Sequence, residues 1–97
     1  MMLQEVTIRS ETQEELRPLL EAAIRSEVKS IQHGINRTKE RLAGFEKRYE
    51  LSTEEFLRRF NAQDLGESLD FIEWMGEIKT LRLLQEKQAA LKRAEVE

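Results

Sequence analysis

An apolar stripe between residues 24 and 49 constrains the fold more than any other feature of the sequence. Its members are three or four residues apart, the spacing that places side chains on one face of an α-helix. They are Ile24, Val28, Ile31, Ile35, Leu42, Phe45 and Tyr49, with Thr38 as the one polar interruption. A helix over this range is roughly 39 Å long at 1.5 Å per residue, so it needs a partner helix of similar length.

A second apolar stripe, between residues 71 and 91, can supply this partner. Its members are Phe71, Trp74, Met75, Ile78, Leu81, Leu84, Gln88 and Leu91. Two amphipathic helices of similar length, joined by a short connection, pack most simply antiparallel, at the shallow crossing angle of a coiled coil. The sequence therefore predicts an all-α fold, an antiparallel coiled-coil-like hairpin of two long helices.

Capping residues mark where the helices begin. Ser10, Ser52 and Ser68 each stand where an N-cap is expected, and the first two form capping boxes with a Gln or Glu three residues later. We therefore predict a single helical domain over 1–97, with a long helix over 10–50, a short helical elbow over 52–62 and a second long helix over 68–95.

Some residues inside this layout carry further expectations. Pro18 lies in the first turns of the long helix, where its missing N–H predicts a kink or a restart. Phe56 and Phe60 lie on the elbow and are expected to cap the open end of the hairpin. Gly66 is expected to adopt a positive φ in the turn that follows.

Residues 1–9 leave two interpretations open. Val6 and Ile8 alternate with polar neighbours, as in a short half-buried strand. A lone strand is not stable in water, so it would pair with the same strand of a second copy or with the sheet edge of a partner. The alternative is a terminal arm without regular structure.

Composition excludes several classes of protein. The 97 residues are 39% hydrophobic and 36% charged, as in long paired helices, and they include no cysteine. A disulfide framework and a cysteine-bound zinc are therefore excluded. No apolar run approaches the ~18 residues of a membrane span, and the N-terminus lacks the layout of a secretion signal. We expect a cytoplasmic protein without a membrane segment or a cofactor.

The charge pattern argues against nucleic acid as the main ligand. The chain has 19 acidic and 16 basic residues, a net charge of −3, and the two signs are mixed along it. Binding to phosphate backbones needs a basic face. The most basic region consists of Arg37, Lys39, Arg41, Lys47, Arg48, Arg58 and Arg59. Since no aromatic platform is interleaved with them, we interpret these residues as solvated flanks of the hairpin.

A weaker apolar line follows the opposite side of the last helix from Trp74. It consists of Ile72, Leu83, Ala90 and Ala94. The line would be exposed in a monomer, and a homodimer through the last helix would bury it. A strand containing Val6 and Ile8 would add to this self-association. A different protein partner, or a mere scatter of exposed apolar residues, are the alternatives.

The densest acidic run surrounds the start of the last helix. With the aromatic residue beside it, the run gives a candidate partner-binding set: Asp64, Glu67, Asp70, Glu73, Trp74 and Glu77. Carboxylates beside an exposed aromatic suit the docking of a basic protein partner. A solvated helix face, with acids favoured by the helix dipole in its first turn, is the alternative.

The sequence offers no catalytic or metal-binding constellation. His33 is the only histidine and is expected to face solvent. Nucleophile elbows, phosphate loops and zinc-protease motifs do not occur. General acid–base catalysis by the acidic run would require a partly desolvated pocket, which nothing in the pattern indicates. We therefore do not expect an enzyme.

Two segments carry a resemblance to a known family. Residues 45–56 read FEKRYELSTEEF and residues 64–74 read DLGESLDFIEW, of which DFIEW is the most distinctive part. Together they resemble small helical antitoxin-like proteins of prokaryotic toxin–antitoxin pairs, over about the second half of the chain. The resemblance implies a small cytoplasmic protein that binds and blocks a partner toxin, often one that cleaves RNA.

The N-terminus is similar to a second family. Residues 6–9, followed by a capped helix, resemble the start of ribbon-helix-helix DNA-binding proteins, in which a dimeric strand pair enters the major groove. The first helix here continues far beyond the length that this fold requires. Three hypotheses follow: an antitoxin-like binding module, a self-assembling helical protein, and a dimeric DNA-binding regulator that uses Thr7 and Arg9.

Overall fold

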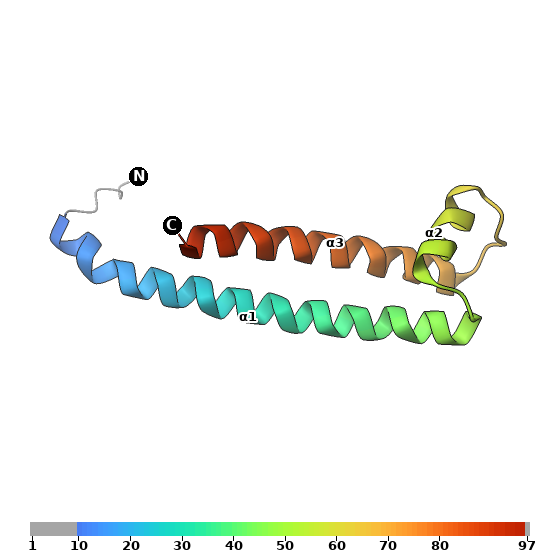
Figure 1. Cartoon of the computed structure of the whole chain (residues 1–97), viewed down its shortest axis with the longest axis horizontal. Helices are drawn as coiled ribbons and strands as arrows, with labels where there is room; N and C mark the ends of the chain where they lie inside the picture. Colours follow the sequence, from blue (N-terminus) through green and yellow to red (C-terminus); the bar gives the residue numbers. More distant parts are fainter. Residues whose placement is uncertain (1–9, 97) are drawn as a thin grey trace.

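The computed structural model describes residues 10–96 of the chain, and the side chains of residues 14–94. This part contains three α-helices, α1 (Ser10–Tyr49), α2 (Thr53–Asn61) and α3 (Leu69–Val96). α1 and α3 lie side by side and antiparallel, and α2 lies where the chain reverses (Figure 1). The all-α hairpin is confirmed, and each bound lies within one residue of the expected one. The suggested strand with Val6 and Ile8 falls outside the described residues.

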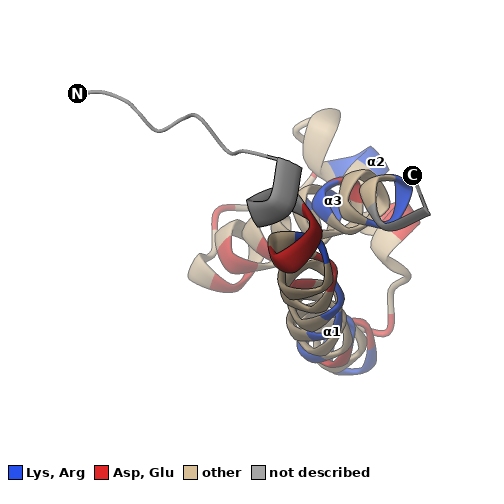
Figure 2. Ribbon diagram, turned by 90° about the vertical axis from the view of Figure 1, so that its left-hand side faces the viewer, with Lys and Arg blue, Asp and Glu red and all other residues tan. Residues whose placement is uncertain are grey.

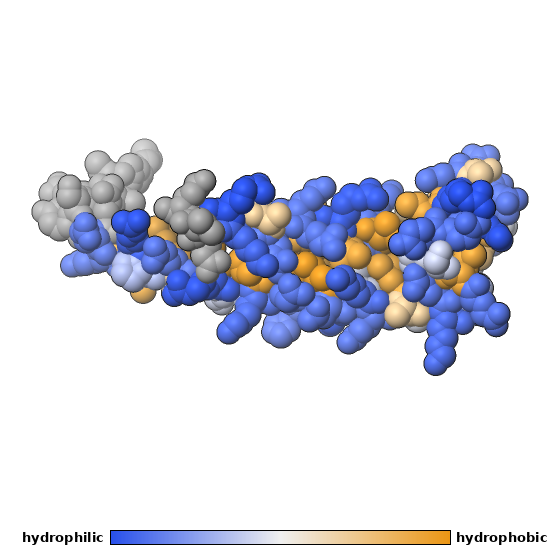
Figure 3. All heavy atoms as spheres, viewed as in Figure 1, coloured by the Kyte–Doolittle hydropathy of each residue, from blue (hydrophilic) through white to orange (hydrophobic). Residues whose placement is uncertain are grey.

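The apolar stripe of α1 faces α3. Ile31, Ile35 and Leu42 are 7%, 3% and 8% exposed. Thr38, the polar interruption, is also buried, and its hydroxyl donates a hydrogen bond of 2.9 Å to the carbonyl of Gly34. The helix backbone thereby satisfies the hydroxyl, so a threonine can occupy the buried stripe without an unpaired polar group. Figure 3 shows apolar atoms along the line where the two long helices meet.

The register of the two helices is set by one polar contact and one close approach. Gln88 of α3 donates hydrogen bonds to the side chain of Gln32, at 2.8 Å, and to the carbonyl of Val28, at 3.4 Å. A Cβ on Gly34 would lie 3.3 Å from Cδ1 of Leu84. The side chain of Leu84 therefore packs directly against Gly34, in space that a larger residue at position 34 would need.

This register leaves the beginning of α1 without α3 beside it. Eighteen residues of α1, 10–27, precede Val28, whereas only eight residues of α3, 89–96, follow Gln88. Roughly the first three turns of α1 therefore extend past the end of α3 (Figure 1). Leu19 and Leu20 in this region are 66% and 58% exposed.

The sequence predicted that Pro18 would either kink the helix or restart it. It does not restart the helix. α1 is continuous from Ser10 to Tyr49 with Pro18 inside it, and its first turns lean away from the axis of the rest (Figure 1). Pro18 is exposed. Water can therefore bond to the Glu14 carbonyl, which has lost its intrahelical donor, and this lowers the cost of continuing the helix.

The closed end of the hairpin holds an aromatic core. Trp74 and Phe56 are both 0% exposed, and Phe45 stacks on Trp74 with ring centroids 5.4 Å apart. The indole N–H of Trp74 donates to the hydroxyl of Thr53, at 3.2 Å. Phe60 packs against this core from α2, so the two phenylalanines lie at the closed end of the hairpin and not at the open end that the sequence predicted.

The hypothesis that Trp74 is an exposed docking aromatic is therefore wrong. Trp74 belongs to the apolar stripe of α3, and Phe56 of α2 covers its ring from the other side. The sequence places Trp74 beside carboxylates, but helical geometry turns the ring toward the core and its neighbours toward solvent.

Two non-glycine residues in the left-handed region end the first two helices. Glu50 has φ 51° after α1, and Gln63 has φ 58° after α2. The N–H of Leu51 then bonds to the carbonyl of Glu46, at 3.1 Å, as in a Schellman motif. The expectation of a positive φ at Gly66 is wrong, because Gln63 completes the reversal three residues earlier.

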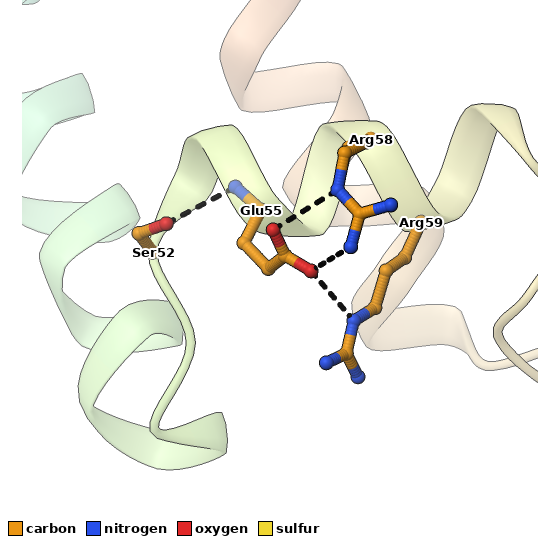
Figure 4. A network of polar contacts seen from close by, with 4 residues as sticks. All are labelled: Ser52, Glu55, Arg58 and Arg59. Carbon is orange, nitrogen blue, oxygen red and sulfur yellow. Dashed lines mark hydrogen bonds and ion pairs between the residues drawn. The ribbon is translucent and has the colours of Figure 1, made fainter.

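The start of α2 carries the polar network drawn in Figure 4. Ser52 caps the helix, since its hydroxyl accepts a bond of 3.0 Å from the N–H of Glu55. The carboxylate of Glu55 does not complete the capping box but binds Arg58 and Arg59 instead. These two guanidinium groups lie along the helix from Glu55, and their charge attracts the carboxylate away from the cap.

Candidate protein-binding surface on the last helix

One side of α3, pointing away from α1, exposes large apolar side chains. We call the residues Leu69, Ile72, Gly76 and Leu83 the outer face of α3. The side chains of Leu69, Ile72 and Leu83 are 78%, 63% and 53% exposed. Steps of seven residues join Leu69, Gly76 and Leu83, and two helical turns return a residue to the same side. The outer face is therefore a line of apolar residues over the first half of α3, with the exposed Lys79 and Thr80 between Gly76 and Leu83.

This line continues toward the end of α3 with small residues. Ala90 and Ala94, predicted from sequence to join Ile72 and Leu83 on this side, are both exposed. The structure thus places all four residues of the predicted line in solvent.

A groove borders the outer face at the elbow. It has a volume of about 820 Å³ and lies between the end of α2, residues 62–68 and the start of α3. Phe60, Leu65 and Phe71 provide apolar lining, and Ile72 belongs both to this groove and to the outer face. An apolar side chain approaching the outer face would therefore find a recess beside Ile72.

A second groove, of about 650 Å³, borders the outer face on its other side. Gly44 of α1 and Gly76 of α3 line it, with Phe45 between the helices. A Cβ on either glycine would meet no atom within 4 Å, so both glycines face open space in this groove. The missing side chains leave room for another backbone or side chain to approach the hairpin.

The predicted acidic residues divide into two groups. Asp64, Glu67 and Glu73 are exposed, and Glu67 and Glu73 line the elbow groove and the second groove respectively. Asp70 and Glu77 are partly buried. The three exposed acids are free to contact a basic partner that docks on the neighbouring apolar surface. The two partly buried acids bind side chains of α1 instead.

Asp70 joins the start of α3 to the end of α1. Its Oδ2 accepts hydrogen bonds from the hydroxyl of Tyr49 and from the guanidinium of Arg48, both at 2.6 Å. These bonds, from Tyr49 first and Arg48 second, lower the pKa of Asp70. The same bond raises the pKa of Tyr49, since the phenol donates to a carboxylate. Asp70 is thus a structural link between α1 and α3.

Glu77 is the partly buried acid of the second groove. Its Oε2 lies 3.5 Å from a guanidinium nitrogen of Arg41, and its side chain is 22% exposed. Its Oε1 is buried and has no hydrogen-bond partner within the described part of the chain. A buried carboxylate oxygen without a donor costs free energy, which a donor entering the groove would recover.

The basic residues form no continuous face among the described residues. Figure 2 shows Lys and Arg mixed with Asp and Glu on the helices. Several of the predicted basic flank residues form ion pairs, namely Arg41, Arg48, Arg58 and Arg59. Thr7 and Arg9, assigned to DNA in the ribbon-helix-helix comparison, lie outside the described residues.

The described part of the chain shows neither a metal site nor a helix that could cross a membrane. His33 is exposed, and no group of three His, Asp or Glu side chains is arranged to hold a metal ion there. None of the three described helices is long and apolar enough to cross a membrane.

Comparisons of the chain with protein-family models, with curated proteins and with solved structures find no match. Sequence reasoning identified Ile72 and Leu83 but missed Leu69, Gly76 and both grooves. The seven-residue spacing of Leu69, Gly76 and Leu83 was visible in the sequence, while the grooves depend on how α1, α2 and α3 are packed.

Proposed function

We propose that this protein is a non-catalytic protein-binding module and that the outer face of α3 is its docking surface. The observation that carries the proposal is the exposure of three large apolar side chains, Leu69, Ile72 and Leu83, on one side of a single helix. Exposed apolar strips of this kind, rimmed by polar residues, are typical of protein–protein interaction sites.

The charges beside this face favour a partner with a basic surface. Asp64, Glu67 and Glu73 are exposed acids, the last two at the grooves, and Glu77 contributes a carboxylate oxygen that has no donor among the described residues. A partner helix with an apolar stripe and flanking Lys or Arg residues would cover the apolar side chains and supply these donors. Charge complementarity would also speed association and disfavour acidic competitors.

A narrower proposal is that the partner is a toxin and that binding neutralises it in the cytoplasm. Support comes from the resemblance of residues 45–56 and 64–74 to antitoxin-like proteins. Residues 64–74 contain Leu65 and Glu67 of the elbow groove and Leu69 and Ile72 of the outer face. The resembling segment and the proposed docking surface therefore overlap.

Self-association through the same face is the second candidate. Ile72, Leu83, Ala90 and Ala94 are all exposed and could be covered by α3 of another copy, giving a homodimer. The two candidates differ in what covers the outer face, so a heterologous partner and a homodimer formed there would exclude each other.

The test is co-expression with the protein encoded by the adjacent reading frame, scoring growth rescue and complex formation. We expect both with the wild type. The double variant Ile72→Asp, Leu83→Asp should lose both, because two carboxylates would be desolvated in the interface. Ala43→Asp is the matched control: Ala43 is exposed on α1, outside the outer face and the grooves, and this variant should behave as the wild type.

The outcomes separate the candidates. Absence of both rescue and complex with the wild type removes the antitoxin-like proposal. A stable dimer that the double variant dissociates, without any heterologous complex, supports self-association through α3. A complex that the double variant leaves intact removes the outer face as the docking surface.

A further inference from the structure

A face of α1 near its N-terminus is exposed and has a spacing of its own. Leu16, Leu19, Ala23, Ser26 and Ser30 are three or four residues apart, as in the seam of a coiled coil. Leu19 is 66% exposed, Ala23, Ser26 and Ser30 are exposed as well, and Leu16 is half-buried. We call these five residues the α1 seam.

The α1 seam is not the surface that packs against α3. Its first residues lie where α1 extends past the end of α3, and the neighbouring stripe residues, from Ile24 onward, turn toward α3. At Ser30, which lines a groove of about 330 Å³ with Gly34, the surface of the hairpin is hollowed. The described part of the chain therefore leaves this seam available to another molecule.

The order of large and small residues along the seam suits pairing with a second copy that runs in the opposite direction. Large residues, Leu16 and Leu19, occupy its N-terminal half, and the small residues Ala23, Ser26 and Ser30 occupy its C-terminal half. A second copy running antiparallel, with the two-fold axis at Glu21, places Leu16 opposite Ser26 and Leu19 opposite Ala23. Each leucine then faces a small residue, which allows the two helices to approach closely.

The charges beside the seam favour the same arrangement. Glu15 and Lys29 flank its two ends on one side, and both are exposed. Antiparallel pairing places Glu15 of one copy beside Lys29 of the other, twice in the dimer. Parallel pairing would instead place leucine on leucine, and it would leave Glu15 and Lys29 of the two copies about 14 residues apart along the helices, so that these pairs could not form.

We propose that the α1 seam is an interface between two copies of this chain, which pair antiparallel with Leu16 opposite Ser26 and Leu19 opposite Ala23. The dimer is isologous, as two-fold interfaces are. It differs from dimerisation through α3, and it leaves the outer face of each copy free for another partner. The inference does not depend on the proposed function.

The first test is the oligomeric state in solution, measured by sedimentation equilibrium. We expect the wild type to have twice the 11.5 kDa mass of the chain. Leu19→Asp should raise the dissociation constant of the dimer more than about tenfold. Leu83→Asp, the matched change on the outer face of α3, should leave the dimer intact. A wild-type monomer at every concentration, or a Leu19→Asp dimer as tight as the wild type, overturns the proposal.

A charge exchange tests the orientation without removing apolar surface. Glu15→Lys and Lys29→Glu should each weaken the dimer, and the double variant should restore it, because each pair again joins opposite charges. Circular dichroism on each variant separates loss of pairing from loss of helix. Single variants that fold but do not weaken the dimer, or a double variant weaker than both, contradict the antiparallel pairing.

Cysteine cross-linking gives an independent readout, since the chain contains no cysteine. Ala22→Cys lies beside the two-fold axis and should be joined to its copy by a short bismaleimide. Lys29→Cys should not, because its two copies would be about 24 Å apart along the helices. Efficient cross-linking at both positions indicates a parallel pair and overturns the proposal, as does its absence at Ala22→Cys.

Discussion

The rings of Phe56 and Trp74 stack with centroids 4.0 Å apart and an interplanar angle of 3°. Both side chains are fully buried, and they come from α2 and α3. This contact attaches the short α2 to the closed end of the hairpin, and so it positions the elbow groove beside the outer face of α3.

Phe56→Ala should therefore destabilise the protein by about 3–5 kcal/mol, through lost apolar burial and the cavity that remains. Urea denaturation followed by circular dichroism measures the change. The fluorescence of Trp74, the only tryptophan, should shift to longer wavelength as water reaches the ring. Leu69→Ala, at a side chain that is 78% exposed, should change stability by less than about 0.5 kcal/mol. Equal losses in the two variants would contradict this account of the core.

Asp70→Asn should lower the pKa of Tyr49 toward the ordinary value for tyrosine. The Tyr49 phenol donates to the Asp70 carboxylate, whose charge also opposes formation of the phenolate, so the pKa of Tyr49 is raised. The chain contains a single tyrosine, so ultraviolet absorbance at alkaline pH reports this group alone. An unchanged titration in the variant would show that Asp70 does not hold Tyr49 in solution.

The pH dependence of stability follows from the same pair. The contribution from the raised pKa of Tyr49 is fully present below the ordinary tyrosine pKa and is lost as the pH rises through the raised value. The contribution from Asp70, whose pKa is lowered, is present above the ordinary aspartate pKa and is lost as the pH falls through the lowered value. Urea midpoints across pH should show both losses in the wild type, with smaller changes in Asp70→Asn.

Glu55 should titrate far below other glutamates. Hydrogen bonds from Arg58 and then Arg59 lower the pKa of Glu55 from 4.5 to about 2. Carbon-detected NMR titration of the side-chain carboxyl measures this pKa, and Arg58→Gln together with Arg59→Gln should return it toward 4.5. Because all three side chains are partly exposed, high salt should also raise it. The stability that this pairing contributes is present above pH 4.5 and is lost as the pH falls toward 2.

Gly44→Ala should stabilise the protein by about 1 kcal/mol, the difference in helix propensity between glycine and alanine. A Cβ at Gly44 meets no atom within 4 Å, whereas at Gly34 it would lie 3.3 Å from Leu84. Gly34→Ala should therefore gain less, since Leu84 must move to accommodate the methyl group. Urea midpoints of the two variants test this, and an equal gain would show that the hairpin has room at Gly34.

Much of the fold could be predicted because it depends on local periodicity. The spacing of Ile31, Ile35 and Leu42 indicated a buried helix face, and all three are buried. The N-cap at Ser52 likewise depends only on residues within one turn. The candidate site could be predicted only in part. The positions of Ile72 and Leu83 on one side of the helix follow from the helical period, but the grooves beside them do not.

Trp74 shows where sequence proximity misleads. Carboxylates precede and follow it in the chain, so the sequence suggested a docking aromatic at an acidic surface. Which side of α3 the ring takes is decided by its place in the apolar stripe, and its complete burial by Phe56 and Phe45 from two other helices. Asp70 similarly became a link to Tyr49 and Arg48, because the register of α1 brings them within 2.6 Å.

By itself, the sequence determined three helices, their bounds to within one residue, and the apolar faces of the two long ones, since these properties follow from the α-helical period and from capping within one turn. Only the tertiary structure decided how far α1 extends past α3, which acids remain free, and where grooves open beside Ile72 and Gly76. These depend on contacts between residues more than twenty positions apart, and nothing in local spacing sets such contacts. The α1 seam depends on the sequence and on the tertiary structure. Its spacing is visible in the sequence, and its exposure results from the register that Gln88 sets between α1 and α3.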